Sequence, residues 1–191
     1  MTQQTLKYLT TAKECHAWCL AQKHIGQTLA LVPTMGALHA GHLALVTHAL
    51  QQADRVIVSI FVNPTQFAPT EDFDAYPRNL ELDLKHLKAL GVHAVFCPKT
   101  TELYSDSLND QTLVMPRSVR QILCGQSRPH FFQGVATIVL KLLNCCQPDI
   151  AVFGEKDYQQ LIVIRQMVQD LLISCHIHSV PTVRTQTGLA L

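Results

Sequence analysis

The stretch Pro33-Thr34-Met35-Gly36-Ala37-Leu38-His39-Ala40-Gly41-His42 decides how this chain can fold. A short apolar run, 29–32, precedes it, and the apolar-periodic segment 43–50 follows it. This order predicts a buried strand, a glycine-containing turn and a helix. His39 and His42 are three residues apart, a spacing that brings two side chains onto one face of a helix.

The start of this helix is suited to binding a polyphosphate. The first N–H groups of a helix have no partner within it and carry a partial positive charge, so phosphate groups bind there. Two imidazoles beside such a site can donate hydrogen bonds and stabilise the charge that develops when an α-phosphate is attacked. We therefore predict nucleotidyl transfer. A His-x-x-His pattern also arises by chance, and it carries weight only in this strand–turn–helix context.

Strands and helices alternate along the whole chain. Helices are predicted at 10–23, 41–53, 80–90, 134–146 and 157–172, and strands at 29–32, 55–62, 93–97, 149–153 and 176–183. This alternation indicates parallel βαβ units, so we expect an α/β fold of the Rossmann-like type, a doubly wound parallel sheet with helices on both faces. Ligands of such sheets bind at the carboxyl ends of the strands. The stretch quoted above, a long loop at 63–79 and the segment after 153 all lie at that edge.

Composition limits the class of protein. The chain has 191 residues, of which 48% are hydrophobic and 15% charged, with a formal net charge of +1. It shows neither the basic stripe typical of nucleic-acid binding nor the roughly 18–20 apolar residues that a membrane span needs. The seven cysteines form no C-x-x-C pair, and several lie in apolar stretches where cysteine behaves as a small hydrophobic residue. We predict a cytoplasmic protein with reduced thiols.

Amide side chains follow the strand predicted at 55–62. Asn63 and Gln66 can bind the hydroxyl and carboxylate oxygens of a small polar substrate, although Asn-Pro is also ordinary turn sequence. Arg128, which precedes the helix at 134–146, can bind a phosphate or carboxylate bidentately, or it can be a solvated loop residue.

The segment after the strand at 149–153 again opens a helix. Gly154 allows close backbone approach, and Lys156 can pair with a phosphate as a point charge. Asp157 can bind a ligand or simply cap the helix, and Gln160 lies one turn further on. No G-x-x-x-x-G-K-[ST] motif occurs in the sequence, which argues against an ATPase of the P-loop class.

Taken together, these segments resemble the pantothenate synthetase (pantoate–β-alanine ligase) family of HIGH-type nucleotidyltransferases. The resemblance runs along nearly the whole chain and rests on the ordered segments 33–42, 61–67 with 76–78, 128–134, 153–166 and 180–184. It implies an ATP-driven condensation in pantothenate and coenzyme A biosynthesis. Pantoate is first converted to pantoyl adenylate with release of pyrophosphate, and the amine of β-alanine then displaces AMP.

The resemblance also implies roles for individual residues. It assigns catalysis to His42 as proton donor, His39 and Lys156. It assigns substrate binding to Gln66, Asn63, Gln160 and Arg128. ATP binding falls to Met35, Gly36, Ala37, Leu38, His39, Ala40, Gly41, His42, Gly154, Glu155, Lys156, Asp157 and Val183. The resemblance also implies that Mg²⁺ binds mainly to the ATP phosphates, with Asp83 as its protein contact. It further implies a homodimer.

The resemblance implies more chain than this sequence contains. The family continues after Gly-Leu-Ala with a Ser-Ser-Arg-Asn signature and a small C-terminal lid domain, whereas the sequence ends at Leu191. We expect residues 1–191 to form the nucleotide- and pantoate-binding domain alone, with weak substrate binding and little or no turnover. Two alternatives stay open: a HIGH-type nucleotidyltransferase that acts on another acid or a phosphate ester, and a non-catalytic binding domain on the same fold.

Overall fold

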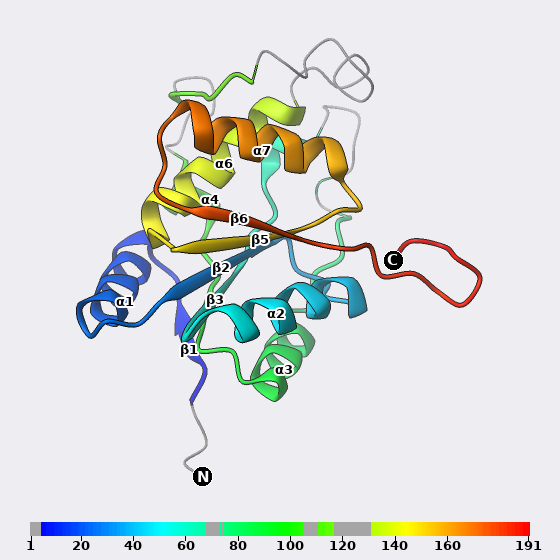
Figure 1. Cartoon of the computed structure of the whole chain (residues 1–191), viewed down its shortest axis with the longest axis horizontal. Coiled ribbons are helices and arrows are strands. Elements are labelled where there is room, and N and C mark those ends of the chain that lie inside the picture. Colours follow the sequence, from blue (N-terminus) through cyan, green and yellow to red (C-terminus); the bar gives the residue numbers. More distant parts are fainter. Residues whose placement is uncertain (1–4, 68–72, 74, 105–110, 117–130) are drawn as a thin grey trace.

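A computed structural model describes residues 5–67, 73, 75–104, 111–116 and 131–191. The elements, in chain order, are β1 (Lys7–Leu9), α1 (Ala12–His24), β2 (Leu29–Thr34), α2 (Ala40–Gln52), β3 (Arg55–Ile60), the 3₁₀ turn η1 (Pro64–Gln66), α3 (Leu80–Leu90), β4 (Ala94–Phe96), α4 (Thr100–Leu103), α6 (Phe131–Cys146), β5 (Ile150–Gly154), α7 (Tyr158–Asp170) and β6 (His176–Val180). In this part of the chain, six strands form one parallel sheet in the order β1-β4-β3-β2-β5-β6 (Figure 1). The predicted α/β fold is confirmed.

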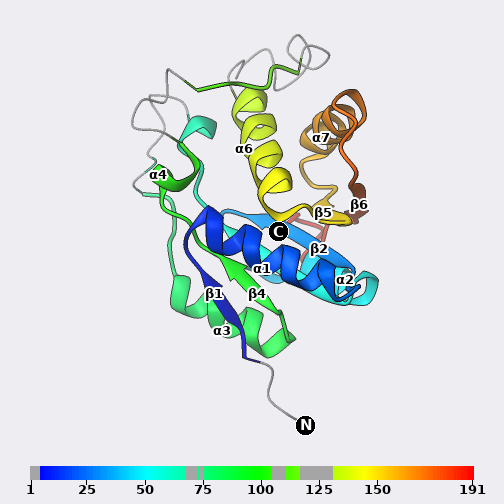
Figure 2. The same ribbon diagram turned by 90° about the vertical axis from the view of Figure 1, so that its left-hand side faces the viewer.

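Helices cover both faces of the sheet (Figure 1, Figure 2). The helices α1, α6 and α7 pack on one face, where they share a core with Leu29 and Leu31. The helices α2 and α3 pack on the other face, against Ala30 and Val32. Alternate residues of β2 therefore point into two different cores, which explains why this strand is apolar throughout.

The strand order reverses between β2 and β5. From β2 the chain adds β3 and then β4 on one side, and it later adds β5 and β6 on the other side. Ligands of doubly wound sheets bind outside the carboxyl ends of the strands at such a reversal. The predicted segments 33–42 and 154–160 include the ends of β2 and β5, so the fold brings them to this place.

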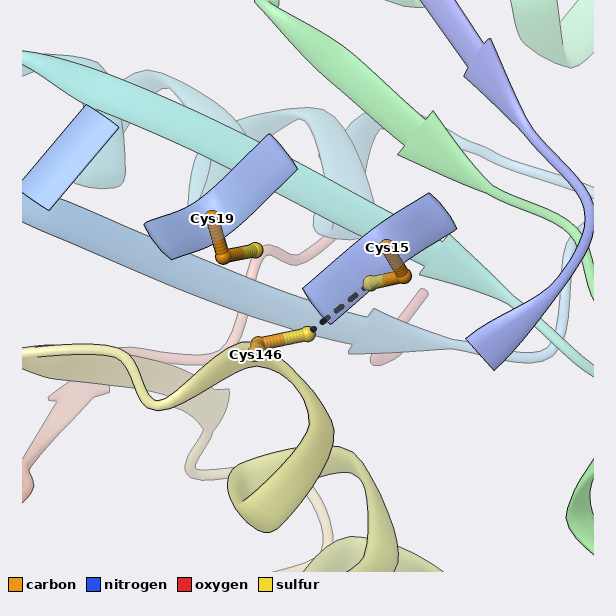
Figure 3. Close-up of side chains that lie close together, drawn as sticks. All are labelled: Cys15, Cys19 and Cys146. Carbon is orange, nitrogen blue, oxygen red and sulfur yellow. Dashed lines mark hydrogen bonds between the residues drawn. The ribbon is translucent and has the colours of Figure 1, made fainter. Parts of the chain in front are cut away.

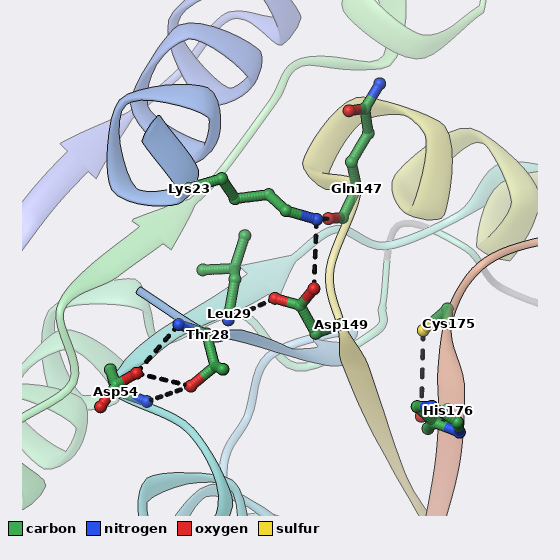
Figure 4. A network of polar contacts seen from close by, with 8 residues as sticks. All are labelled: Lys23, Thr28, Leu29, Asp54, Gln147, Asp149, Cys175 and His176. Atoms are coloured by element: carbon green, nitrogen blue, oxygen red, sulfur yellow. Dashed lines mark hydrogen bonds and ion pairs between the residues drawn. The ribbon is translucent and has the colours of Figure 1, made fainter. Parts of the chain in front are cut away.

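Polar contacts fix the opposite, amino end of the sheet (Figure 4). The backbone N–H of Leu29 donates to Asp149 at 2.8 Å, and the other carboxylate oxygen of Asp149 lies 3.2 Å from Lys23 Nζ. Thr28 donates to Asp54 from its N–H at 2.9 Å and from its hydroxyl at 2.7 Å. These bonds hold the pKa of the Asp54 carboxyl below its usual value, and the bond from the backbone N–H contributes most. The starts of β2, β3 and β5 are thus tied together at the end remote from the predicted site.

The structure adds short elements that the sequence does not predict. These are β1, η1 and α4, each of three or four residues, which is too short for a periodic pattern to appear. The predicted helix 134–146 begins earlier, at Phe131, and the strands predicted at 55–62 and 176–183 end at Ile60 and Val180. None of the described helices has the length and apolar character needed to cross a bilayer.

Candidate active site

A buried carboxylate holds the loop between β2 and α2. Asp83 on α3 is 2% exposed, and its oxygens accept the backbone N–H groups of Ala37 at 2.9 Å and Leu38 at 2.7 Å. Gly36 and Ala37 both have positive φ, 84° and 51°. This conformation costs alanine about 1–2 kcal/mol, and the carboxylate binds the N–H groups that the turn exposes. Asp83 therefore positions the loop, and the Mg²⁺ contact that the resemblance implies for it stays a prediction.

His39 and His42 lie together at the start of α2, with ring centroids 4.2 Å apart. His39 is the N-cap residue, and its Nδ1 accepts the N–H of Gly41 at 3.1 Å. The Nδ1 of His42 accepts the N–H of His39 at 3.4 Å. Because each Nδ1 is an acceptor, each neutral ring carries its hydrogen on Nε2. Both Nε2–H groups are then hydrogen-bond donors to a ligand.

His42 is neutral at pH 7 in the free site. Burial, with smaller contributions from the nearby His39 and Lys156, lowers the pKa of His42 to about 4, and Asp83 opposes this shift. A neutral imidazole stabilises developing negative charge by hydrogen bonding. It becomes a proton donor only where a bound anion raises its pKa.

We expect an NMR titration of the free chain to give His42 a midpoint near pH 4, far below the value of about 6.5 typical of histidine. Adding Mg·ATP should raise the midpoint, because phosphate charge favours the imidazolium form. Long-range ¹H–¹⁵N spectra would report both the midpoint and the tautomer, with His42→Gln to assign the signal. A midpoint near 6.5 in the free chain, or an Nδ1–H tautomer, would contradict this description.

Two cavities open at the carboxyl ends of β2 and β5 and share part of their lining. The shared residues are Pro33, Met35, His42, Tyr76, Phe153, Asp157 and Gln160. The inner cavity has a volume of about 170 Å³ and the outer cavity about 290 Å³. A larger groove of about 650 Å³ runs along α3, but none of the predicted site residues lines it. Another cavity of about 490 Å³ is lined by Met35, Gly36 and Asp83 but by neither predicted histidine. The two cavities that meet at His42 are therefore the candidate site.

The inner cavity combines amide groups with an apolar wall. Gln66 at the end of η1 and Gln160 on α7 supply the amides. The apolar wall is formed by Phe61 and by residues of α6, namely Val135, Ile138, Val139 and Leu142. Such a cavity suits a small ligand with polar ends and a branched apolar body.

Asn63 lines the inner cavity but is largely occupied by other parts of the protein. It is 1% exposed, and its Oδ1 accepts the hydroxyl groups of Tyr104 at 2.9 Å and Thr65 at 3.0 Å. Its Nδ2 donates to the carbonyl oxygen of Gly134 at 3.3 Å. The side chain thereby fixes the turn that carries Gln66 against α6. The direct substrate contact implied by the resemblance stays a prediction, since Asn63 also lines the inner cavity.

Gly134 allows η1 to lie directly on α6. A Cβ atom at this position would lie 2.5 Å from the Thr65 carbonyl oxygen and 2.7 Å from its hydroxyl oxygen. We expect Gly134→Ala to displace the turn and to lower the free energy of unfolding by about 1–3 kcal/mol, as overpacking does. Chemical denaturation would measure this loss. Asn144→Ala, at an exposed position of the same helix, is the control and should not destabilise the chain. Unchanged stability of Gly134→Ala would show that the contact is looser than described.

The outer cavity carries groups that suit phosphate. His39 and His42 line it from the start of α2, His39 as the N-cap residue. Lys156 lines it from the segment after β5, and Val183 from beyond β6. Asp157 occupies the N-cap position of α7, but its side chain makes no capping hydrogen bond. Its carboxylate instead lines both cavities.

Some predicted residues lie elsewhere. The carboxylate of Glu155 accepts the hydroxyl of Ser179 at 3.0 Å, beside the edge strand β6. The predicted ATP-binding residues that line neither cavity are Gly36, Ala37, Leu38, Ala40 and Glu155. Arg128 lies outside the described residues.

Sequence reasoning assigned no role to Tyr76 or Phe153, although both line the two cavities. The signal for Tyr76 was its place in the Tyr-Pro-Arg segment 76–78. The apolar wall on α6 gave no signal, because its residues fit equally well in a buried core.

Known proteins are similar to this chain in sequence. A family model described as pantoate-beta-alanine ligase matches residues 7–191. Pantothenate synthetase of Pseudomonas aeruginosa (strain UCBPP-PA14) is 51% identical over 181 residues, or 95% of this chain. Pantothenate synthetase of Idiomarina loihiensis is 52% identical over 186 residues, or 97% of this chain. The chain spans only 64% and 65% of the length of these two curated relatives.

Solved structures share the fold. Pantothenate synthetase from Thermus thermophilus superposes with a TM-score of 0.89 and is 43% identical, over 97% of this chain and 65% of that one. Pantoate-beta-alanine ligase from Francisella tularensis, complexed with beta-gamma ATP and beta-alanine, gives a TM-score of 0.91 and 39% identity. This second match covers 98% of this chain and 71% of that one.

Proposed function

Because this chain belongs to the pantoate-beta-alanine ligase family, we propose that residues 1–191 form the nucleotide- and pantoate-binding domain of a pantothenate synthetase. In the proposed first step, a carboxylate oxygen of pantoate attacks the α-phosphate of ATP and pyrophosphate leaves. In the second step, the amine of β-alanine attacks the acyl carbon and AMP leaves. The observation that carries the proposal is the meeting of two cavities at His42, one rich in phosphate-binding groups and the other amide-lined and apolar.

The outer cavity is proposed to bind ATP. The Nε2–H groups of His39 and His42 would donate to phosphate oxygens, and Lys156 would add a positive charge at the same end. Val183 would contact the adenine. Hydrogen-bond donors that are fixed before the reaction stabilise the pentavalent α-phosphate without the cost of reorientation. The Francisella tularensis ligase is described as complexed with beta-gamma ATP, which supports ATP as the nucleotide.

The inner cavity is proposed to bind pantoate. This acid has a carboxylate, two hydroxyl groups and a carbon that bears two methyl groups. Gln66 and Gln160 would bind the oxygen atoms, and the apolar wall on α6 would contact the methyl groups. Because His42 and Asp157 line both cavities, the carboxylate of pantoate would meet the α-phosphate where the cavities join.

Mg²⁺ is proposed to arrive on the ATP phosphates, where it would neutralise charge on the leaving pyrophosphate. This ion usually keeps several waters and takes one or two carboxylates besides phosphate oxygens. Among the described residues that line the two cavities, Asp157 is the one acidic side chain, and it fits this role. Asp83 fits it less well, because its oxygens are occupied by the loop.

Calorimetric titration with pantoate, with and without Mg·ATP, tests the proposal. We expect saturable binding that Gln66→Ala weakens by about tenfold, the effect of one lost hydrogen bond, while Mg·ATP binding persists. The matched control is Gln51→Ala, at an exposed position of α2. Binding of ATP without pantoate would favour a nucleotidyltransferase for another acid. Binding of neither ligand would favour a non-catalytic domain.

The family resemblance also leads us to propose a cytoplasmic homodimer. Free thiols support the compartment, because the six cysteines in the described ranges are unpaired with one another in disulfides. Sedimentation equilibrium at micromolar concentration would test the assembly, and a monomer throughout would reject it.

A further inference from the structure

Four cysteines come together where α1 meets α6. Cys15 and Cys19 lie one turn apart on α1, and Cys145 and Cys146 end α6. Figure 3 shows the sulfur atoms of Cys15, Cys19 and Cys146 turned toward one another across the helix contact. These three residues are 0%, 1% and 0% exposed. No sequence pattern indicated this group, because the two helices lie far apart along the chain.

The sulfur atoms are spaced as metal ligands are. The Sγ atoms of Cys15 and Cys146 are 3.6 Å apart, and the Sγ atoms of Cys15, Cys19 and Cys146 all lie within 4.8 Å of one another. Zn–S bonds of about 2.3 Å in a tetrahedral site place two sulfurs roughly 3.8 Å apart. Small rotations of the side chains would therefore close the group around one ion.

Cys145 lies at the partly exposed edge of this group. Its Sγ is not among the three that lie within 4.8 Å of one another, so its side chain would have to turn from Ala12 to supply a fourth donor. Its thiol donates to the carbonyl oxygen of Ala12 at 3.4 Å and interacts with the thiols of Cys15 and Cys146. Four thiolates are the complete ligand set of one common class of structural zinc site.

Basic groups lie near the cluster: Lys23 is one turn beyond Cys19, and His16 is beside Cys15. The interpretation of these cysteines as small hydrophobic residues explains their burial but not the convergence of their sulfur atoms.

We propose that Cys15, Cys19, Cys145 and Cys146, the thiol cluster, bind one Zn²⁺ ion that joins α1 to α6. Each coordinating thiol releases its proton to solvent as the Zn–S bond forms. The ion would crosslink α1 and α6, which pack on the same face of the sheet. Residues of α6 also form the apolar wall of the inner cavity. Its role is structural, because four protein ligands leave no open position for a substrate.

The test is a titration of the reduced chain with Zn²⁺ against a chromophoric chelator, repeated with Co²⁺ as a spectroscopic probe. We expect one equivalent of Zn²⁺ per chain and a Co²⁺ spectrum with thiolate charge-transfer bands. At a hundredfold excess of Zn²⁺ over its Kd, the Tm should rise by roughly 5–10 °C. Cys15→Ala and Cys146→Ala should abolish these effects.

Two variants serve as controls. Cys175→Ala removes a buried thiol that belongs to the same core but not to the cluster. This variant should bind one equivalent of Zn²⁺, as the unmodified chain does. His178→Ala tests another possible metal site, the pair in which His178 Nδ1 lies 3.2 Å from His48 Nε2. This variant should also keep the thiolate spectrum.

If the alanine variants do not fold, the intact chain still decides the question. Bound Zn²⁺ should slow the reaction of the cluster thiols with a thiol reagent at least tenfold. Absence of stoichiometric binding, a Co²⁺ spectrum without thiolate bands, or unchanged thiol reactivity would overturn the proposal. So would oxidation of Cys15 and Cys146 to a disulfide in the presence of excess Zn²⁺.

Discussion

Replacing His42 with alanine should slow pantoate-dependent release of pyrophosphate by about 10²–10³-fold, the usual cost of removing one donor to a developing oxyanion. His42 lines both cavities, and its Nε2–H is free to donate because its Nδ1 accepts a backbone N–H. Charge on the α-phosphate oxygens grows as the pentavalent state forms. A donor placed there therefore acts more strongly on the transition state than on bound ATP.

Comparison of rate with affinity separates this role from simple ATP binding. A single neutral hydrogen bond contributes about 1 kcal/mol, so the Kd for Mg·ATP should rise less than tenfold while the rate falls far more. Single-turnover experiments with the chain in excess make even slow release measurable. The control is His48→Ala, a histidine of the same helix that pairs with His178 and lines neither cavity. Equal losses of rate and affinity would contradict the proposed role.

The fold was predictable from the sequence because its periodic segments are long. The helices at 80–90 and 157–172 and the strand at 55–62 are all present with small shifts at their ends. The edge strand β1 could not be predicted in this way, since three residues form no pattern and its place is decided by pairing with β4.

The site was less predictable, because motifs reveal which residues gather but not what each one touches. The segments containing His42, Gln66 and Gln160 do meet at the two cavities. The hydrogen bonds of Asn63 and Asp83 join elements from different parts of the chain, so only the folded structure reveals that both side chains position loops. The thiol cluster depends in the same way on the packing of α1 against α6.

Replacing Asp83 with asparagine should disrupt the histidine loop although Asp83 touches neither cavity. The two carboxylate oxygens accept N–H groups at 2.9 and 2.7 Å. Asparagine keeps one acceptor and turns an NH₂ donor toward the other N–H group. One hydrogen bond to a buried charge is lost and two donors face each other, which should lower the free energy of unfolding by about 2–4 kcal/mol. The left-handed turn at Gly36 and Ala37 then loses the contact that holds it.

Chemical denaturation and ATP titration with and without Mg²⁺ would distinguish a positioning carboxylate from a metal ligand. If Asp83 positions the loop, Asp83→Asn should raise the Kd for ATP at least about tenfold, whether or not Mg²⁺ is present. The reason is that His39 and His42 directly follow the displaced turn. If Asp83 were a metal ligand, stability would change little and only the Mg²⁺-dependent part of the affinity would fall. Glu81→Gln removes the same charge from an exposed site in the first turn of α3 and should change stability by less than about 0.5 kcal/mol. Suppose that Asp83→Asn loses clearly more stability than Glu81→Gln, and that its loss of ATP affinity does not depend on Mg²⁺. The buried carboxylate on α3 would then be what holds the phosphate-binding end of the cleft in place.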